Sequence, residues 1–457
     1  MSLKLQSKNM RHKRTKVINP DAPLESLEAK QPDIDLGIKC YDKNSNFDPR
    51  TMLDEWEKVW TRSWLLAGVT SDLSDVGDYF LFNIFHESII VTLTKEGIKA
   101  FFNVCSHRGA ILVDEPRGNQ KVFVCPFHNW TFRNTGDLIR ITDEDTFDPR
   151  VVGHRPGLVS VSCETHAGII FVNLQDDPSP LSEEIGLPDG YLEAYRIEKM
   201  NVVRHVVSEW GSNWKVGVEA FYESYHLHAV HPETKGMMGD LNVQYDLYPC
   251  GASRMIVPLG QPSPRLHDQK SVNEGLQFML REAGIDPATF EGEAADVRVA
   301  IQKAKRQYAA EKGLDYSAFV DGQLSDSWAT GIFPNVQIGC HPEGVFIMRF
   351  VPHPKDPERF FYDTMTLFMP SGDAAKAPMW MGLPEGTDVS GRVRPPTEHY
   401  DIHQDPNLGL VLSQDAAFLP KVQRGMRSKG FVGQLWGEQE QRLRHFHVEL
   451  NRRLEIE

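Results

Sequence analysis

Cysteines are few in this sequence, and long apolar runs are missing. Six cysteines occur among 457 residues, scattered from Cys40 to Cys340, which is not the dense pattern of a small disulfide-stabilised protein. We therefore expect a reducing, cytoplasmic setting. No stretch of 18 consecutive apolar residues is present, so the sequence predicts no membrane-spanning helix.

Positive charge is also scarce. The chain carries 49 Lys and Arg against 63 Asp and Glu, a net charge of -14, whereas nucleic-acid binding needs a basic footprint to meet the phosphates. This balance argues against a nucleic-acid partner, although it does not exclude a local basic patch for a small acidic protein. The first twenty residues are basic and lack acids. We expect a flexible N-terminal arm there rather than a transit peptide.

Three regions of different sequence character follow this arm. Residues 47–69 place apolar side chains at helical spacing and end in an apolar stretch, which predicts an amphipathic helix followed by a strand. Residues 76–178 consist of short β-rich runs separated by turns such as "KEG" and "RNTGD", typical of a small antiparallel β domain. The segment "QDDPSPLSEE" (175–184) is rich in Pro, Ser and acids, and it predicts a domain boundary.

The rest of the chain mixes both kinds of element. Helical periodicity covers 212–230, 272–284, 294–312, 406–428 and 437–454. Strand-like runs cover 200–208, 334–340, 344–351 and 360–369. The long Gly- and Pro-rich segment 370–396 predicts a lid, a partner contact or a disordered loop. The second domain is therefore predicted to be α+β, with helices packed on an antiparallel sheet.

Two Cys/His pairs stand within the predicted β domain. Cys105 and His107 are separated from Cys125 and His128 by the seventeen residues 108–124. Two thiolates and two imidazoles are enough to close a metal site, and each pair lies at a strand end beside a turn. On the ligand set alone, a structural Cys2His2 zinc site and an iron–sulfur cluster both fit.

The residues around these pairs decide between the two. "CSHRGA" and "CPFHNWTFRNTGDL" closely resemble the two cluster-binding loops of Rieske [2Fe–2S] proteins. The resemblance implies that Cys105 and Cys125 hold one iron and that His107 and His128 hold the other. Such a cluster has a reduction potential of roughly -150 to +300 mV. Asn129 stands where the family usually has Gly, but it changes neither a ligand nor the spacing.

A Rieske cluster alone transfers electrons, so the residues beyond it must distinguish two kinds of protein. One is an electron-transfer or structural metal-binding protein, and the other is an oxygenase with a second iron held by two histidines and a carboxylate. The stretch "EAFYESYHLHAVH" (219–231) offers three histidines. His228 and His231 would share one face of a regular helix, whereas His226 and His231 need the helix to stop between them. Pro232 disfavours helix at His231, so the spacing leaves both pairings open.

The same stretch resembles the iron-binding segment of Rieske ring-hydroxylating oxygenase α subunits. The residues that match the family pattern around the ligands are Asn213, Trp214, Lys215, Glu219 and Tyr225. By this resemblance His226 and His231 are iron ligands, and His228 is a helix histidine bonded to backbone or water. The third ligand that the resemblance implies is Asp415, on an apolar helix otherwise free of acids from 408 to 433.

Two positions depart from the family pattern. Ala220 replaces an asparagine that is common near the iron. Glu223 stands where most members have an aspartate that bridges a cluster histidine of one subunit to an iron histidine of its neighbour. By resemblance, Glu223 would carry electrons from His128 of one subunit to His226 of another. Glutamate here is similar to family members that oxidise alkylammonium or other non-ring substrates, which weakens the expectation of ring dihydroxylation.

The resemblance covers roughly 47–455 and implies the terminal oxygenase of a multicomponent system. Such an enzyme uses O2 and electrons from a ferredoxin or an NAD(P)H-dependent flavin reductase. It oxidises an aromatic substrate by ring hydroxylation, or by a monooxygenation that leads to N- or O-dealkylation. The implied cofactors are the [2Fe–2S] cluster and a mononuclear Fe2+. The chain has no GxGxxG fingerprint, so flavin and NAD(P)H are expected on partner proteins.

The resemblance also implies the architecture. An N-terminal arm and helix (1–61) belong to the catalytic domain, an antiparallel β Rieske domain (62–178) follows, and residues 179–457 complete a helix-grip (START-like) catalytic domain. A homotrimer is expected, with an α3β3 assembly as the alternative. The residues expected to approach the substrate, because they flank the ligands, are Phe221, Leu227 and Val411. Met237 and Met238 fit either loop packing or an adaptable pocket.

Overall fold

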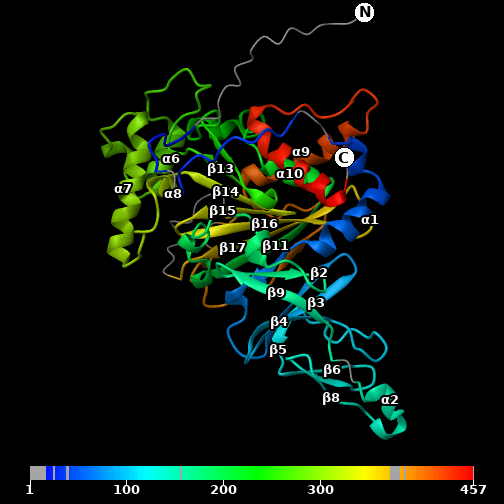
Figure 1. Ribbon diagram of the computed structural model, residues 1–457. Helices are drawn as coiled ribbons and strands as arrows, with labels where there is room; N and C mark the ends of the chain where they lie inside the picture. The colour runs from blue at the N-terminus through cyan, green and yellow to red at the C-terminus, as the bar shows by residue number, and fades with distance from the viewer. Residues whose placement is uncertain are drawn as a thin grey trace, which may run out of the picture.

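The structure is a computed structural model that describes residues 17–23, 26–37, 41–154, 157–370, 381–384 and 387–455. The expected N-terminal arm up to residue 16 lies outside the described residues. So do residues 371–380 and 385–386 of the predicted loop. Figure 1 shows a β domain at one end of the molecule and a larger domain in which helices cover a sheet.

The β domain is built from two antiparallel sheets. The strands of the larger sheet are, in spatial order, β1 (Leu65–Val69), β10 (Ile169–Asn173), β9 (Ser160–His166), β4 (Gly97–Phe102), β3 (Glu87–Thr94), β2 (Asp78–Ile84) and β5 (Arg117–Asn119). Those of the smaller sheet are β6 (Val122–Val124), β7 (Thr131–Arg133) and β8 (Leu138–Arg140). Along β2, Phe80 and Phe82 are buried in the core shared with the larger domain, whereas Tyr79 is buried in the core beneath the Cys/His loops. The β domain predicted from sequence is confirmed.

The larger domain is organised around an eight-stranded sheet. Its strands are, in spatial order, β12 (Gln244–Leu247), β13 (Ser253–Val257), β14 (Ser327–Ile332), β15 (Val336–His341), β16 (Gly344–Pro352), β17 (Phe360–Phe368), β11 (Asn201–Trp210) and β18 (Glu398–Tyr400). The pairs are antiparallel except that β18 runs parallel to β11. The four strands predicted from sequence are present, and the predicted α+β class is confirmed.

Four strands of this sheet escaped the sequence prediction, namely β12, β13, β14 and the three-residue β18. The sequences of β12, β13 and β14 carry buried polar residues that hide the apolar pattern of a strand. Asp246 and Arg254, for example, are cross-strand neighbours and form an ion pair at 2.7 Å while almost fully buried. A buried charge is tolerated when it is paired in this way.

Helices α9 (Leu410–Met426) and α10 (Gln441–Leu454) lie on the side of this sheet that faces away from the β domain, whereas α2 (Pro149–Val152) lies at the tip of the β domain (Figure 1). The α-helices are α1 (Pro49–Lys58), α2 (Pro149–Val152), α3 (Leu181–Glu184), α4 (Trp214–Phe221), α5 (Leu227–Val230), α6 (Glu274–Glu282), α7 (Ala294–Lys312), α8 (Asp321–Ser325), α9 (Leu410–Met426) and α10 (Gln441–Leu454). Of these, α4 packs on β16 and α9, while α1 contacts α10. None of the described helices is both long and apolar enough to cross a bilayer.

The prediction of one helix over 212–230 is wrong in its middle. The chain leaves helix after Phe221 and resumes it at Leu227. Ser224 causes this break, because its hydroxyl lies 2.7 Å from the hydroxyl of Tyr245 and contacts the carbonyl of Asp240, while its backbone NH donates to Tyr245. Such polar bonds compete with the hydrogen bonds of a continuous helix.

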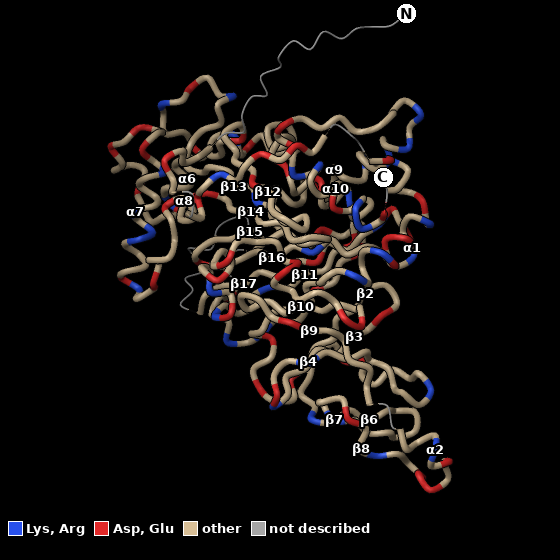
Figure 2. The backbone as a smooth tube through the Cα atoms, in the orientation of Figure 1, with Lys and Arg blue, Asp and Glu red and all other residues tan. Residues whose placement is uncertain are grey.

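Charged residues join the two domains. Asp72, on a short 3-10 helix, forms ion pairs with Arg117 of β5 and with Arg394 of the larger domain, at 2.9 and 2.7 Å. Burial raises the pKa of Asp72, but the charges of the two arginines outweigh it and lower the pKa. Elsewhere, acidic and basic residues are interspersed along both domains (Figure 2).

Candidate metal centres

The two Cys/His loops of the β domain share one backbone geometry. In the first, the NH of Gly109 donates to the carbonyl of Cys105, and in the second the NH of Asn129 donates to the carbonyl of Cys125. Gly109 and Asn129 occupy equivalent places, and their φ values are +76° and +58°. Asn tolerates this left-handed conformation better than most residues. The departure from Gly at Asn129 therefore leaves the loop geometry intact.

The side chains of these loops converge and leave their metal-binding atoms unsatisfied. Cys105 and Cys125 are buried, and burial raises the pKa of the Cys105 thiol. The rings of His107 and His128 lie 4.7 Å apart between centroids. The Nδ1 atoms of both rings are buried without a hydrogen-bond partner. Because buried polar atoms almost always find a partner, two orphaned nitrogens beside two buried thiols fit a metal cluster.

Trp130 fixes the orientation of the first imidazole. Its ring stacks on His107 with a centroid distance of 4.6 Å and an interplanar angle of 8°. The loops also carry apolar side chains that face solvent, among them Phe127 and Ile111. Arg108 lies over the ring of Phe127 at 5.1 Å. The tip of the β domain therefore presents an apolar and cationic surface around the candidate cluster.

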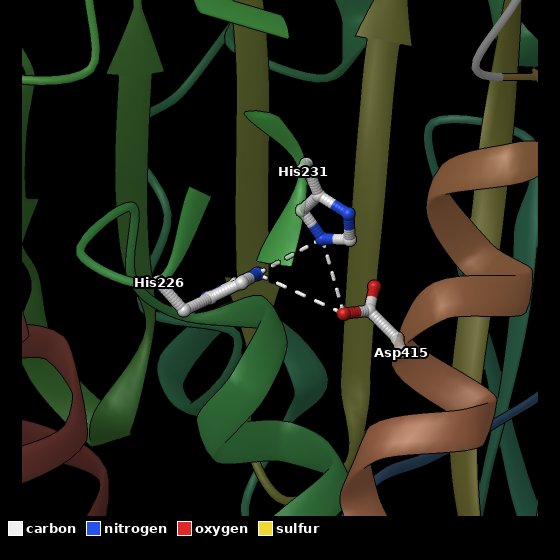
Figure 3. Close-up of side chains that lie close together, drawn as sticks. All are labelled: His226, His231 and Asp415. Carbon is white, nitrogen blue, oxygen red and sulfur yellow. Dashed lines mark hydrogen bonds and ion pairs between the residues drawn. The ribbon is translucent and has the colours of Figure 1, made fainter. Parts of the chain in front are cut away.

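The larger domain brings His226 and His231, which are five residues apart, together with Asp415, which is distant in sequence (Figure 3). One candidate ligand atom from each residue lies within 4.8 Å of the others. The two Nε2 atoms are 3.2 Å apart, and Oδ1 of Asp415 lies 3.1 Å from Nε2 of His231 and 3.8 Å from Nε2 of His226. Two histidines and one carboxylate in this arrangement match the donor set that binds non-haem Fe(II) and leaves open coordination positions.

The way α5 ends makes this geometry possible. His231 follows the last residue of α5 and has φ -121° and ψ +60°, outside the helical region. The expected effect of Pro232, to end the helix just before His231, is thereby confirmed. His228 points elsewhere, with Nδ1 2.7 Å from the carbonyl of Tyr225. It takes no part in the convergent group.

Hydrogen bonds orient both imidazoles of the group. Nδ1 of His226 lies 2.5 Å from Glu223 Oε1, and Nδ1 of His231 lies 2.6 Å from Gln414 Oε1. Burial lowers the pKa of His226, but the hydrogen bond and charge of Glu223 outweigh it, with help from Asp415, and raise the pKa. Each ring thus has its Nδ1 held by a side-chain oxygen and its Nε2 directed at the shared point, as is usual for a metal-binding histidine.

Gln414 was missed in the sequence analysis. Its partner His231 is 183 residues away, so no local spacing could reveal the contact. A second such contact joins Glu219 of α4 to His447 of α10, whose Nε2 lies 2.8 Å from Glu219 Oε1. Glu219 also accepts a hydrogen bond from Gln434 at 2.9 Å.

Two cavities flank the convergent group. The larger, of about 500 Å³, is lined by His226 and Asp415 themselves. Its other carboxylates are Glu219, Glu223 and Glu440, and its aromatic residues are Phe418, Phe431 and Trp436. The smaller, of about 170 Å³, lies under the N-terminal end of α9 and has a mainly apolar lining. Phe221, Val411, Met237 and Met238 line the smaller cavity, whereas Leu227 lines neither.

Two known protein families match separate parts of the chain. The Rieske [2Fe–2S] domain family matches residues 63–154, and the family described as ring hydroxylating alpha subunit (catalytic domain) matches residues 197–456. The second match covers more than half of the chain. The chain belongs to the ring-hydroxylating alpha subunit family. The resemblance drawn from sequence is confirmed, and the cofactors of this family are a [2Fe–2S] cluster and a mononuclear iron.

Curated relatives of this alpha subunit include oxygenase subunits of several kinds. The chain is 31% identical over 230 residues to the glycine betaine monooxygenase oxygenase subunit of Chromohalobacter salexigens, covering 50% of this chain and 48% of the relative. It is 29% identical over 191 residues to the carnitine monooxygenase oxygenase subunit of Escherichia coli, covering 40% of this chain and 50% of the relative. The alignments thus span about half the length of these relatives.

Solved structures share the fold at low sequence identity. A quaternary ammonium Rieske monooxygenase matches with a TM-score of 0.64 at 17% identity, covering 93% of this chain and all of the other. Naphthalene 1,2-dioxygenase with indole bound matches with a TM-score of 0.62 at 17% identity, covering 92% of each chain. These likenesses confirm the order of a Rieske domain followed by a helix-covered antiparallel sheet.

Proposed function

We propose that this chain is the terminal oxygenase of a multicomponent Rieske system, which uses O2 to oxidise a small apolar molecule. The observation that carries the proposal is the presence of two separate donor sets, one in each domain. A Rieske electron carrier needs only the first. The second set, with two oriented imidazoles, a carboxylate and an adjoining apolar cavity, is suited to oxygen chemistry.

We assign the ligands of both centres on this basis. Cys105, His107, Cys125 and His128 would hold the [2Fe–2S] cluster. His226, His231 and Asp415 would hold the mononuclear iron. When bound, the two groups supply single-electron transfer and the activation of O2 beside the substrate. The protein's part is to hold the imidazoles in fixed tautomers through Glu223 and Gln414, and to keep water from the apolar cavity.

Glu223 is the proposed electron bridge between subunits. Its carboxylate holds His226 through Nδ1 and faces the larger cavity. We infer that the tip of the β domain of a second copy docks there, bringing His128 of that copy to Glu223. The exposed Phe127 and the cationic Arg108 suit the aromatic and acidic lining of the cavity. A structural relative is described as showing inter-subunit electron transfer. A homotrimer satisfies this head-to-tail contact, and α3β3 is the alternative.

Electrons must reach the chain from a partner protein, which we propose to be a ferredoxin or an NAD(P)H-dependent flavin reductase. The five cysteines within the described residues are free thiols, which supports a reducing cytoplasm.

We retain 1–61, 62–178 and 179–457 as the proposed domain limits. The limits of the middle domain are supported by the Rieske family match at 63–154 and by the end of β10 at Asn173.

The smaller cavity is the proposed substrate site. Phe221 and Val411 line it, and Val411 lies one helical turn before Asp415. An uncharged aromatic molecule suits this lining, to be hydroxylated on the ring or dealkylated at nitrogen or oxygen. A second candidate is oxidation of a quaternary ammonium compound in the larger cavity. The carboxylates and aromatic rings there, together with the glycine betaine and carnitine relatives, favour that candidate.

Metal analysis tests the oxygenase proposal. Three irons and two acid-labile sulfides per chain are expected for an oxygenase, against two irons and two sulfides for a pure Rieske carrier. Labelled O2 should then appear in the product when the reduced protein is supplied with aromatic hydrocarbons, aryl acids or N-alkyl anilides. A preparation with two irons and no labelled product would contradict the proposal.

The bridge is tested by Glu223→Gln. The amide keeps the size of the side chain but loses its charge, so both metal centres should load while electron transfer between them slows. Single-turnover oxidation of the prereduced cluster, followed by its visible absorbance, measures the rate. A rate equal to that of the wild type would remove Glu223 from the electron path.

A further inference from the structure

The floor of the smaller cavity is a part of the eight-stranded sheet where two small residues, Ala329 and Gly339, leave space between larger side chains. Ala329 of β14 pairs with Gly339 of β15, which pairs in turn with Phe346 of β16. In the neighbouring row, Gln337 pairs with Met348, and all five residues line the cavity. Its volume of about 170 Å³ is close to the roughly 150 Å³ of an apolar cavity that takes up benzene. One substituted aromatic ring therefore fits.

Gln337 and Ser327 are the polar side chains of this floor, and Gln337 offers an amide donor. Its Oε1 accepts a hydrogen bond from Nη2 of Arg442 at 3.3 Å, and within the described residues no acceptor contacts its Nε2. The amide cannot be turned round, because a guanidinium group has only donors and must face the oxygen. The N–H donors of Gln337 are thereby directed away from Arg442. Another polar group of the lining, Thr234, already donates to the carbonyl of His231 at 2.8 Å.

Arg442 is an unusual support for this amide. It is fully buried, and no carboxylate among the described residues forms an ion pair with it. Its Nε donates to the hydroxyl of Ser253 at 2.9 Å, and the ring of Tyr222 covers its guanidinium at 4.2 Å. A buried cation without a counter-ion draws electron density from the amide that it touches, which strengthens the amide as a donor.

We propose that Gln337, held in place by Arg442, determines specificity in this cavity by selecting an uncharged aromatic substrate with a carbonyl oxygen. The proposal rests on the proposed function of the cavity as the substrate site. One amide group can satisfy a carbonyl oxygen. In a mainly apolar lining it cannot replace the hydration of a carboxylate. Its N–H donors, which carry partial positive charge, repel a quaternary ammonium group.

Four probes of similar size separate these chemistries. Acetophenone carries a carbonyl oxygen, and α-methylstyrene is its hydrocarbon counterpart, with C=CH2 in place of C=O. Benzoate and phenyltrimethylammonium add a negative and a positive charge. Dissociation constants for the full-length holoenzyme are measured by calorimetry, without turnover. Acetophenone is expected to bind most tightly, and tighter binding of either charged probe would overturn the proposal.

Two variants isolate the donor. Gln337→Glu keeps an acceptor for Arg442 but removes both N–H groups, so the fold keeps its buried partner. The preference for acetophenone over α-methylstyrene should fall by about tenfold, the effect of one hydrogen bond to an uncharged group. Gln337→Met keeps the volume and should show the same loss. An unchanged preference in the folded Gln337→Glu protein would overturn the role of Gln337.

A matched pair of cavity-filling variants locates the binding site. A Cβ added at Gly339 meets only Phe346, at 3.8 Å, and one added at Gly425, in the larger cavity, meets nothing within 4 Å. Gly339→Leu should abolish acetophenone binding, whereas Gly425→Leu should leave it unchanged. The reverse result, or no binding of any probe to the wild type, would overturn the choice of this cavity. Normal binding without any O2-dependent product would instead contradict the proposed oxygenase function alone.

Discussion

The two histidine pairs of the molecule are held in opposite ways. In the β domain, His107 and His128 have bare Nδ1 atoms, and the ring of His107 is fixed by stacking. In the larger domain, His226 and His231 have their Nδ1 atoms occupied by side-chain oxygens, and their Nε2 atoms converge. In the first pair, burial without a partner among the described residues points to Nδ1 as the ligating atom. In the second pair, the anchored Nδ1 leaves Nε2 as the ligating atom.

Substituting one metal ligand should have the largest effect on turnover, and it should remove the metal from one of the two centres only. Asp415→Ala is expected to lose the mononuclear iron and to lower turnover at least ~100-fold, since loss of an outer partner alone costs about 10–100-fold in metal affinity. The visible absorbance of the cluster should remain. Cys125→Ser should show the reverse, with the cluster lost and the mononuclear iron retained. Iron and sulfide analysis checks both, and oxygenase activity surviving in Asp415→Ala would refute the assigned site.

Removing an anchor of Nδ1 should have a smaller effect, confined to the second pair. Gln414→Leu leaves His231 without its orienting oxygen, so the affinity for Fe2+ should fall by about 10–100-fold. Titration of the metal-depleted protein with Fe2+ measures this, while the cluster absorbance should not change. Gln307→Leu, at an exposed position of α7, is the matched control. An equal loss of affinity in both variants would point to a general defect.

A residue at the junction between the domains should affect how the stability of the protein depends on pH, and not how it binds metal. Burial lowers the pKa of His205, and with the charges of Arg394 and Arg349 it outweighs the charge and hydrogen bond of Asp363, which raise the pKa. His205 therefore binds its proton at a lower pH in the folded protein than in the unfolded chain, where protonation occurs below about pH 6.5. A depressed pKa means that stability is lost as the pH falls below that value. Denaturant unfolding between pH 7 and pH 5 should show a shallower loss in His205→Gln, and the same slope in Gln307→Leu as in the wild type.

The smallest effect is expected in the cluster loops. Asn129→Ala should lower the free energy of unfolding by about 1 kcal/mol, because a left-handed φ is costly for most residues. Gly109→Ala, at the equivalent place in the other loop, should do the same. Asn129→Gly should be nearly neutral and should retain the cluster. Loss of the cluster in that variant would show that the amide of Asn129 has a further role.

Local patterns made much of this predictable from sequence. Each Cys/His loop is contiguous, so its spacing and turn residues survive as a motif, and Pro232 marks the end of a helix by sterics alone. Contacts between segments that are distant in sequence could not be predicted in this way, because no local pattern marks them. Gln414 meets His231 only because α9 lies against the end of α5, and β13 is disguised by Arg254, whose charge is neutralised by a neighbouring strand. The break at Ser224 likewise depends on Tyr245, which is distant in sequence.

Helix α9 divides its residues between two tasks. Val411 and Leu412, near its start, line the smaller cavity, whereas Asp415, Phe418 and Val422 face the larger one. A protein engineer can therefore reshape the proposed substrate site at the start of this helix while leaving unchanged the surface where we propose that a second copy docks. The same division would let substrate range diverge in evolution while the proposed contact between subunits stays the same.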